Sequence, residues 1–127
     1  MGKLEIPDVE SVARGLLELA ITQEEVGSVI PGWVEGEPEF IRTTFLSLMV
    51  ETSELLQEFN WKQWKKPTSP DHAKMADEFA DMLAFLGYIV KWLGDLGISP
   101  LDLAEAYKDK TEVNKKRLAG KVSGYGI

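Results

Sequence analysis

Apolar residues recur every three to four positions along four stretches of this chain, and this spacing predicts four amphipathic helices. Proline and glycine cluster between the stretches, most densely in residues 28–38, where they predict a loop. Asp8 and Ser99 stand where helix N-caps are expected, and Gly27 and Gly120 stand where helices are expected to stop. The predicted helices cover about residues 8–27, 39–59, 70–93 and 99–118.

The pattern therefore predicts an all-α, four-helix-bundle-like fold. Residues 1–127 are expected to form a single domain, with a mobile tail over about residues 120–127. Two apolar stripes are expected to supply most of the core. The stripe on the second helix comprises Phe45, Leu48, Met49, Leu55, Leu56 and Phe59, and that on the third comprises Met75, Phe79, Met82, Leu86, Ile89 and Leu93.

An acidic pair accompanies each stripe. Glu51 and Glu54 follow the edge of the first stripe, Glu78 lies within the second, and Asp81 lies beside it. Residues three apart on a helix share a face, so each pair points two carboxylates the same way. Converging carboxylates near a core repel one another and are costly to bury, and a divalent cation would relieve both problems. The alternative is two ordinary amphipathic helices whose acids form salt bridges with lysines.

Composition narrows the possible functions. A 127-residue chain with 44% hydrophobic residues can bury a core of its own. The absence of cysteine excludes disulfides, thiolate zinc sites and a cysteine nucleophile. A net charge of −7 disfavours nucleic acid as a partner. No run approaches the roughly 20 apolar residues of a membrane span, and residues 1–10 lack an apolar signal core, so we expect a cytoplasmic protein with no membrane partner.

Two further segments carry candidate chemistry. Residues 61–66 combine two tryptophans with three lysines, which suits either a solvated basic turn or contact with phosphate. On the last helix, one face carries Lys110, Asn114 and Arg117, which could clamp phosphate or pair with acids such as Glu51, Glu58 and Asp77.

These motifs, in this order, resemble the all-α nucleoside triphosphate pyrophosphatases, a group that includes the MazG-like enzymes and the dimeric dUTPases. The shared marks are Glu-x-x-Glu followed by Glu-x-x-Asp, the segment Trp61-Lys62-Gln63-Trp64-Lys65, and a final Tyr-x-x-Lys-x-x-x-Asn-x-x-Arg. The resemblance covers roughly residues 20–125. Asp77 stands where MazG-like relatives often carry glutamate, and Arg117-Leu-Ala-Gly departs from the Arg-Gln of many dUTPases.

The resemblance implies a metal-dependent hydrolase that converts a deoxynucleoside triphosphate and water to the monophosphate and pyrophosphate. The large apolar circumference of the two middle helices separately predicts a homo-oligomer, a dimer or a tetramer. Mg²⁺, or Mn²⁺, suits oxygen-only ligands. A pyrimidine base is expected, dUTP first, because Gln23 offers a donor and an acceptor and bulky tryptophans leave less room for a purine. The implied residues are Glu51, Glu54, Glu78 and Asp81 for metal and catalysis; Lys62, Lys65, Tyr107, Lys110, Asn114 and Arg117 for phosphate; and Gln23, Trp33 and Trp61 for the base.

Two alternatives stay open at this point. One is a broad-specificity MazG-like pyrophosphatase, for which dUTP is one substrate among several. The other is a helical interaction protein without enzymatic activity, in which the acids form surface salt bridges and the tryptophans form an interface.

Overall fold

The computed structural model describes residues 8–28 and 37–120, and the regular structure within these ranges is entirely α-helical. The all-α, four-helix prediction is therefore confirmed. Trp33 and the predicted tail after Gly120 lie outside the described residues. The helices are α1 (Val9–Gly27), α2 (Pro38–Gln57), α3 (His72–Asp95) and α4 (Pro100–Leu118).

Side-chain caps set the start of three helices. Asp8 and Asp71 each accept a hydrogen bond from the backbone N–H three residues later, at 2.7 and 3.1 Å. Ser99 and Asp102 form a reciprocal capping box before α4. Each such cap contributes about 1 kcal/mol to helix stability. Because Asp71 is the cap, α3 begins at His72, two residues later than the spacing predicted.

Helix α2 ends at Gln57, two residues before the predicted Phe59. The N–H groups of Glu58 and Phe59 turn to carbonyls three residues back, both at 3.0 Å. Asn60 then adopts a positive φ of 52°, a left-handed conformation that asparagine tolerates better than most residues. This turn leads the chain out of α2 and into the loop that precedes α3.

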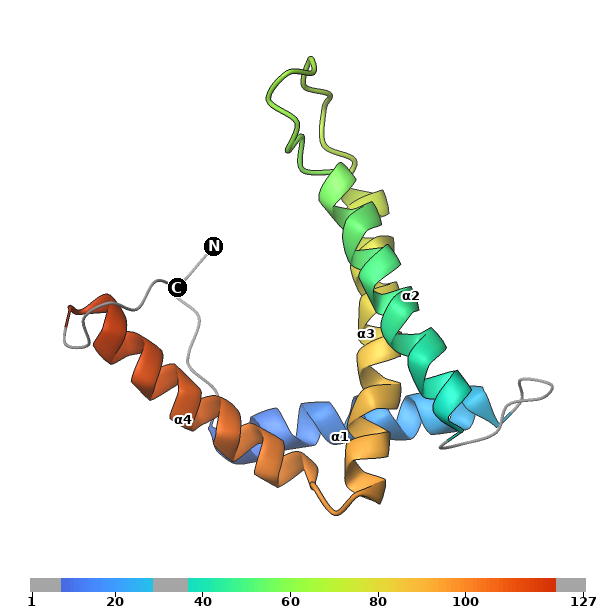
Figure 1. Ribbon diagram of the computed structural model, residues 1–127, viewed down its shortest axis with the longest axis vertical. Coiled ribbons are helices and arrows are strands. Elements are labelled where there is room, and N and C mark those ends of the chain that lie inside the picture. Colours follow the sequence, from blue (N-terminus) through green and yellow to red (C-terminus); the bar gives the residue numbers. More distant parts are fainter. Residues whose placement is uncertain (1–7, 29–36, 121–127) are drawn as a thin grey trace.

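Helices α2 and α3 pack antiparallel as a hairpin, and their connecting loop forms its tip (Figure 1). Helix α1 crosses the C-terminal half of α3, and α4 packs on α1 and runs away from the hairpin. At the crossing, a Cβ on Gly87 would stand 2.7 Å from the carbonyl oxygen of Leu19, so only glycine allows α1 to approach this closely. The arrangement places both acidic pairs on the hairpin, whereas the face of α4 that carries Lys110 and Arg117 lies on a helix packed against α1.

The packed core lies where α2 meets the C-terminal half of α3. Phe40 contacts Tyr88 and Trp92 edge to face, with ring centroids 6.0 and 5.9 Å apart, and those two rings stack on each other. Tyr88 and Trp92 are buried, as are Val90, Ala20 and Ala104. The remainder of the described chain buries few large apolar side chains.

The predicted apolar stripe of α2 does not form the core of a single chain. Half-buried residues of α2 recur at Leu48, Glu51, Leu55 and Glu58, so this edge faces α3. Much of the stripe instead remains exposed, and the exposed fraction reaches 67% at Met49. The prediction was wrong for α2 because this helix packs mainly on α3, and the face that carries Glu51 is the one turned toward α3. The exposed members are Phe45, Met49, Leu56 and Phe59; on α3, Phe79 and Leu86 are exposed as well.

Within residues 8–28 and 37–120, no single helix is both long and apolar enough to cross a membrane. Helices α3 and α4 pass that test only as a pair, which is bent by 109° at the junction.

Candidate active site

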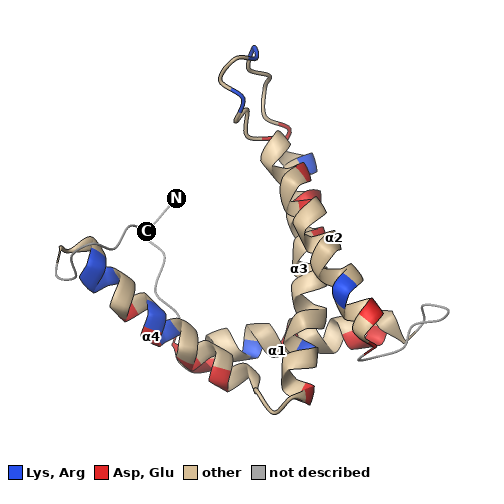
Figure 2. Ribbon diagram, viewed as in Figure 1, with Lys and Arg blue, Asp and Glu red and all other residues tan. Residues whose placement is uncertain are grey.

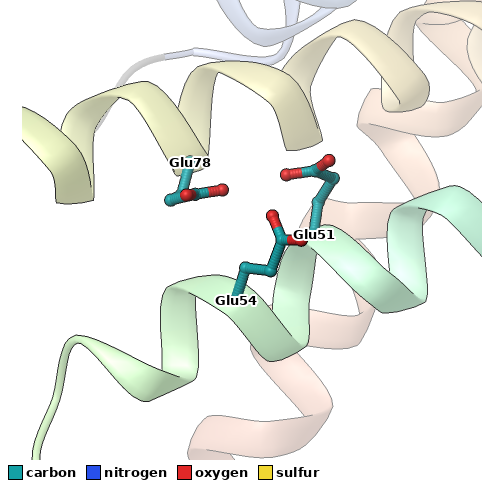
Figure 3. Close-up of side chains that lie close together, drawn as sticks. All are labelled: Glu51, Glu54 and Glu78. Atoms are coloured by element: carbon teal, nitrogen blue, oxygen red, sulfur yellow. The ribbon is translucent and has the colours of Figure 1, made fainter.

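Three carboxylates converge between the two helices of the hairpin. Glu51 and Glu54 project from α2, and Glu78 projects from α3 toward them (Figure 3). Each of the three offers an oxygen that lies within 4.8 Å of an oxygen of the other two. Glu51 and Glu78 are half-buried, whereas Glu54 is exposed and forms the solvent edge of the group. We call these three residues the acidic cluster.

Burial and neighbouring carboxylates disfavour the ionised form of Glu51 in the acidic cluster. Removal from water raises the pKa of its carboxyl from 4.5 to about 7, with further contributions from hydrogen bonding to Glu78 and Glu54 and from the charges of Glu54 and Asp81. The Oε2 atom of Glu51 is buried and has no hydrogen-bond partner. Near neutral pH the carboxyl of Glu51 is therefore partly protonated, and a bound cation would take the place of that proton.

In the part of the chain that the structure describes, basic side chains do not neutralise the acidic cluster. Among the described residues, no lysine or arginine forms an ion pair with Glu51, Glu54 or Glu78. The acid that does pair is Glu58, whose carboxylate lies 3.7 Å from the ammonium of Lys74 and links α2 to α3. The salt-bridge alternative thus describes Glu58 rather than the cluster. An uncompensated set of carboxylate oxygens suits a hard divalent cation such as Mg²⁺ or Mn²⁺.

Asp81 lies beside the acidic cluster rather than within it. It stands one turn after Glu78 on α3, it is exposed, and its charge contributes to the raised pKa of Glu51. Three of the four predicted carboxylates thus converge, and Asp81 lies at the outer edge of the group.

The loop at the tip of the hairpin carries the predicted basic and aromatic residues. The ammonium of Lys62 lies 5.4 Å from the centre of the Trp61 ring, and Trp64 contacts Trp61 edge to face at 5.8 Å. Lys62 is half-buried, and Lys65 is exposed. Figure 2 shows the loop's lysines at the tip and the acids of the hairpin helices below them. The lysines of the loop and the carboxylates of the helices thus lie at successive positions along the hairpin. A phosphate compound that carries a metal ion would need both kinds of group.

The structure does not bring the predicted face of α4 to the acidic cluster. Tyr107 and Lys110 are exposed, and Asn114 and Arg117 are half-buried on a helix that packs against α1 (Figure 1). Within one chain, this helix is directed away from the hairpin. Any role of these four residues at the cluster requires another copy of the chain or a rearranged α4.

Gln23 also lies apart from the acidic cluster. Its Cγ stands 2.6 Å from the position that a Cβ on Gly87 would occupy, so Gln23 covers that glycine. Gly87 comes nine residues after Glu78, which places it about 180° around α3 from the carboxylate. The structure therefore puts Gln23 on the opposite face of α3. Trp33, the other candidate for base contact besides Trp61, lies outside the described residues.

The predictions from sequence missed Asn60, whose side chain closes the tip loop. Its amide donates to the carbonyl of Thr68 at 2.9 Å and accepts from the backbone N–H of Thr68 at 3.0 Å. A signal was available, because Asn60 directly follows the helix end predicted at Phe59, and asparagine just past a helix often adopts the left-handed conformation. The eight-residue separation of its partner, in contrast, has no sequence signature.

Comparison with known proteins agrees with these features. A protein-family model described as dUTPase matches residues 15–91, more than half of the chain. The match spans the acidic cluster, Asp81 and the tip loop, and it stops before α4. Searches of curated proteins and of solved structures find no match. The chain belongs to the all-α dUTPase-like family.

Proposed function

We propose that the protein is a metal-dependent nucleoside triphosphate pyrophosphohydrolase that acts on a deoxynucleoside triphosphate, with dUTP or another pyrimidine nucleotide favoured. The observation that carries this proposal is the acidic cluster, three carboxylates from two helices within 4.8 Å and without a basic ion-pair partner among the described residues. Membership of a dUTPase family supplies the reaction class, a nucleotide pyrophosphatase. The products are a nucleoside monophosphate and pyrophosphate, the role expected of an enzyme that clears unwanted nucleotides.

In this proposal Glu51, Glu54, Glu78 and Asp81 hold Mg²⁺. When bound, the metal supplies charge neutralisation for the triphosphate and activation of a water for in-line attack. Glu54 is the exposed member of the cluster, and we assign it the general-base role of accepting the proton of the attacking water. Lys62 and Lys65 bind phosphate oxygens from the tip loop. The bond between the α- and β-phosphates breaks, and pyrophosphate leaves.

We further propose that the active form is a homodimer or homotetramer. The exposed residues Phe45, Leu46, Met49 and Val50 form a contiguous apolar surface on the outer side of α2, opposite α3. Such a surface is unusual in a monomer and typical of a contact between protein chains. A second copy suits it because the same contact could bring the partner's α4 toward the hairpin, where Lys110, Asn114 and Arg117 would meet phosphate.

A broad-specificity MazG-like pyrophosphatase is the second candidate. The observation that favours it is the position of Gln23 on the face of α3 opposite Glu78. In one chain, this residue cannot read a base whose phosphates lie on the cluster. If oligomerisation does not return Gln23 to the site, Trp61 is the remaining candidate for base contact among the described residues.

The decisive experiment is pyrophosphate release from dUTP, dCTP, dTTP, dATP, dGTP and the ribonucleotides, with Mg²⁺ and with EDTA. The proposal expects equal amounts of monophosphate and pyrophosphate, complete loss with EDTA, and the highest kcat/KM for dUTP. A purine nucleotide with the highest kcat/KM would favour the broad-specificity enzyme. Absence of turnover of every nucleotide would favour the non-enzymatic interaction protein. Gln23→Ala should change the ranking of bases; an unchanged ranking would remove the role given to Gln23.

A further inference from the structure

An ion pair crosses the hairpin next to the acidic cluster, on the side of the tip loop. The ammonium of Lys74, in the first turn of α3, lies 3.7 Å from the carboxylate of Glu58, the C-cap residue of α2. The carboxylate is the less accessible partner, because the Glu58 side chain is 16% exposed and that of Lys74 is 57% exposed. Glu58 comes four residues after Glu54, and Lys74 comes four residues before Glu78. The pair therefore adjoins the cluster on both helices.

Both charges of this pair oppose the local preference of their helices. The C-terminal end of a helix carries partial negative charge and disfavours a carboxylate, and the N-terminal end disfavours a cation. Glu58 nevertheless ends α2, and Lys74 nevertheless lies in the first turn of α3. The stability of each helix by itself does not explain these two residues, so the reason for them lies in the contact between the helices.

A second carboxylate is within reach of Lys74. Glu78 follows it by four residues, a spacing at which side chains on a helix are neighbours. The same helix forms such a pair at its other end, where the ammonium of Lys91 lies 3.6 Å from the carboxylate of Asp95. Among the described residues, however, the ion pair of Lys74 is with Glu58, and none joins it to Glu78. Lys74 thus has two possible partners, and the folded chain pairs it with Glu58.

The choice of partner affects the acidic cluster directly. A lysine paired with Glu78 would place a positive charge where the proposed metal binds, and the metal would have to displace that charge. Glu58 offers Lys74 a carboxylate outside the cluster. The contact across the hairpin therefore keeps the nearest lysine of α3 away from the carboxylates shown in Figure 3.

We propose that Glu58 is a positioning residue of the acidic cluster: it holds the Lys74 ammonium away from Glu78 and so leaves the three carboxylates free for the metal. This inference rests on the proposed metal-dependent function. It assigns to Glu58 an effect on the metal site that does not require Glu58 to bind the metal. The alternative is a pair that only joins α2 to α3, in which case loss of either partner should have the same effect.

Calorimetric titration with Mg²⁺ alone, without nucleotide, tests the proposal. Glu58→Gln should weaken Mg²⁺ binding about fivefold, the factor expected when a metal must displace one exposed lysine from a carboxylate. Lys74→Gln should leave the affinity within about twofold of the wild type, because this lysine is already held away from the cluster. The double variant should also lie within about twofold of the wild type, although it lacks the ion pair altogether.

A matched control separates this effect from general electrostatics. Asp77→Asn also removes one negative charge beside Glu78, but Asp77 is exposed and forms no ion pair among the described residues, so its loss frees no lysine. Adding Lys74→Gln should change Mg²⁺ affinity no more in the Asp77→Asn background than in the wild type. In the Glu58→Gln background, the same addition should raise the affinity about fivefold.

The position of Lys74 provides a readout that does not depend on the metal. In a crystal structure of the metal-free Glu58→Gln variant, the Lys74 ammonium should lie within about 4 Å of the Glu78 carboxylate. The number of protons that Glu51 releases on Mg²⁺ binding should not change, because removal from water is the chief cause of its raised pKa. Thermal melts in EDTA identify any loss of folding in the variants.

Equal weakening by Glu58→Gln, Lys74→Gln and the double variant would overturn the proposal, because the pair would then only stabilise the hairpin. An effect of Lys74→Gln that is the same in every background would also overturn it, because charge alone would explain the result. Absence of Mg²⁺ binding by the wild type would overturn both this inference and the metal site. The proposed function can fail separately. If no nucleotide is hydrolysed but Lys74→Gln still restores Mg²⁺ binding to Glu58→Gln, Glu58 positions a metal site that serves another activity.

Discussion

Binding of Mg²⁺ should release a proton from Glu51, and the number released should fall steeply between pH 6 and pH 8. In the metal-free protein, the pKa of this carboxyl is raised to about 7, chiefly by removal from water. A carboxylate must be deprotonated to bind a cation, so any proton that it holds leaves as the metal enters.

The expected size follows from the position of that pKa. Glu51 is protonated in about 0.9 of the molecules at pH 6, about 0.5 at pH 7 and about 0.1 at pH 8, and these fractions equal the protons released per Mg²⁺ bound. Affinity for Mg²⁺ should correspondingly rise about tenfold per pH unit well below pH 7 and level off above it.

Calorimetric titration in two buffers of different ionisation enthalpy measures the number of protons directly. Glu51→Gln should abolish the release and weaken binding. Glu58→Gln is the matched control, because Glu58 directly follows the same helix but pairs with Lys74, and it should leave the release intact. If Mg²⁺ binds to the wild type at pH 6 without releasing a proton, either Glu51 is not a ligand or it is not protonated, and the reasoning fails.

Four further predictions concern stability and assembly. In EDTA, the free energy of unfolding should fall as pH rises from about 4.5 to about 7, because the folded state holds the Glu51 proton more tightly than the unfolded state. Thermal melts of Glu51→Gln across the same pH range should lack this dependence of stability on pH. Glu78→Gln should abolish turnover, keep the fold, and lose most of the Mg²⁺-dependent rise in Tm; retained activity would exclude Glu78 from the site. Gly87→Ala should destabilise by about 1–3 kcal/mol, since its Cβ meets the backbone of α1, whereas Gly94→Ala has open space and should be neutral or stabilising in denaturant titrations. Met49→Glu should shift sedimentation toward monomer; an unchanged sedimentation coefficient would place the oligomer contact elsewhere.

The helices and their ends were largely determined by local sequence. Periodicity marked all four helices, and Asp8 and Ser99 begin their helices as side-chain caps. The i, i+3 spacing likewise ensured that Glu51 and Glu54 share a face of α2. These features depend on residues within one turn of each other, so they can be read without knowing where the rest of the chain lies.

The tertiary structure decided which face of each helix meets which neighbour. The apolar stripe of α2 looked like core, yet α3 takes the edge that carries Glu51, and Met49 stays exposed. Gln23 packs over Gly87 on the opposite side of α3 from Glu78, although helical spacing alone permitted either side.

The same limit applies to α4 and the tip loop. Periodicity placed Lys110 and Arg117 on one face of a helix, but the packing of that helix on α1 took the face away from the acidic cluster. The bonds between Asn60 and Thr68 close the tip loop across eight residues of chain. Helical spacing specifies the angles between side chains within one helix. The crossing of two helices depends instead on contacts between residues that are distant in the sequence. Those contacts form only in the folded chain or in its assembly with a second copy.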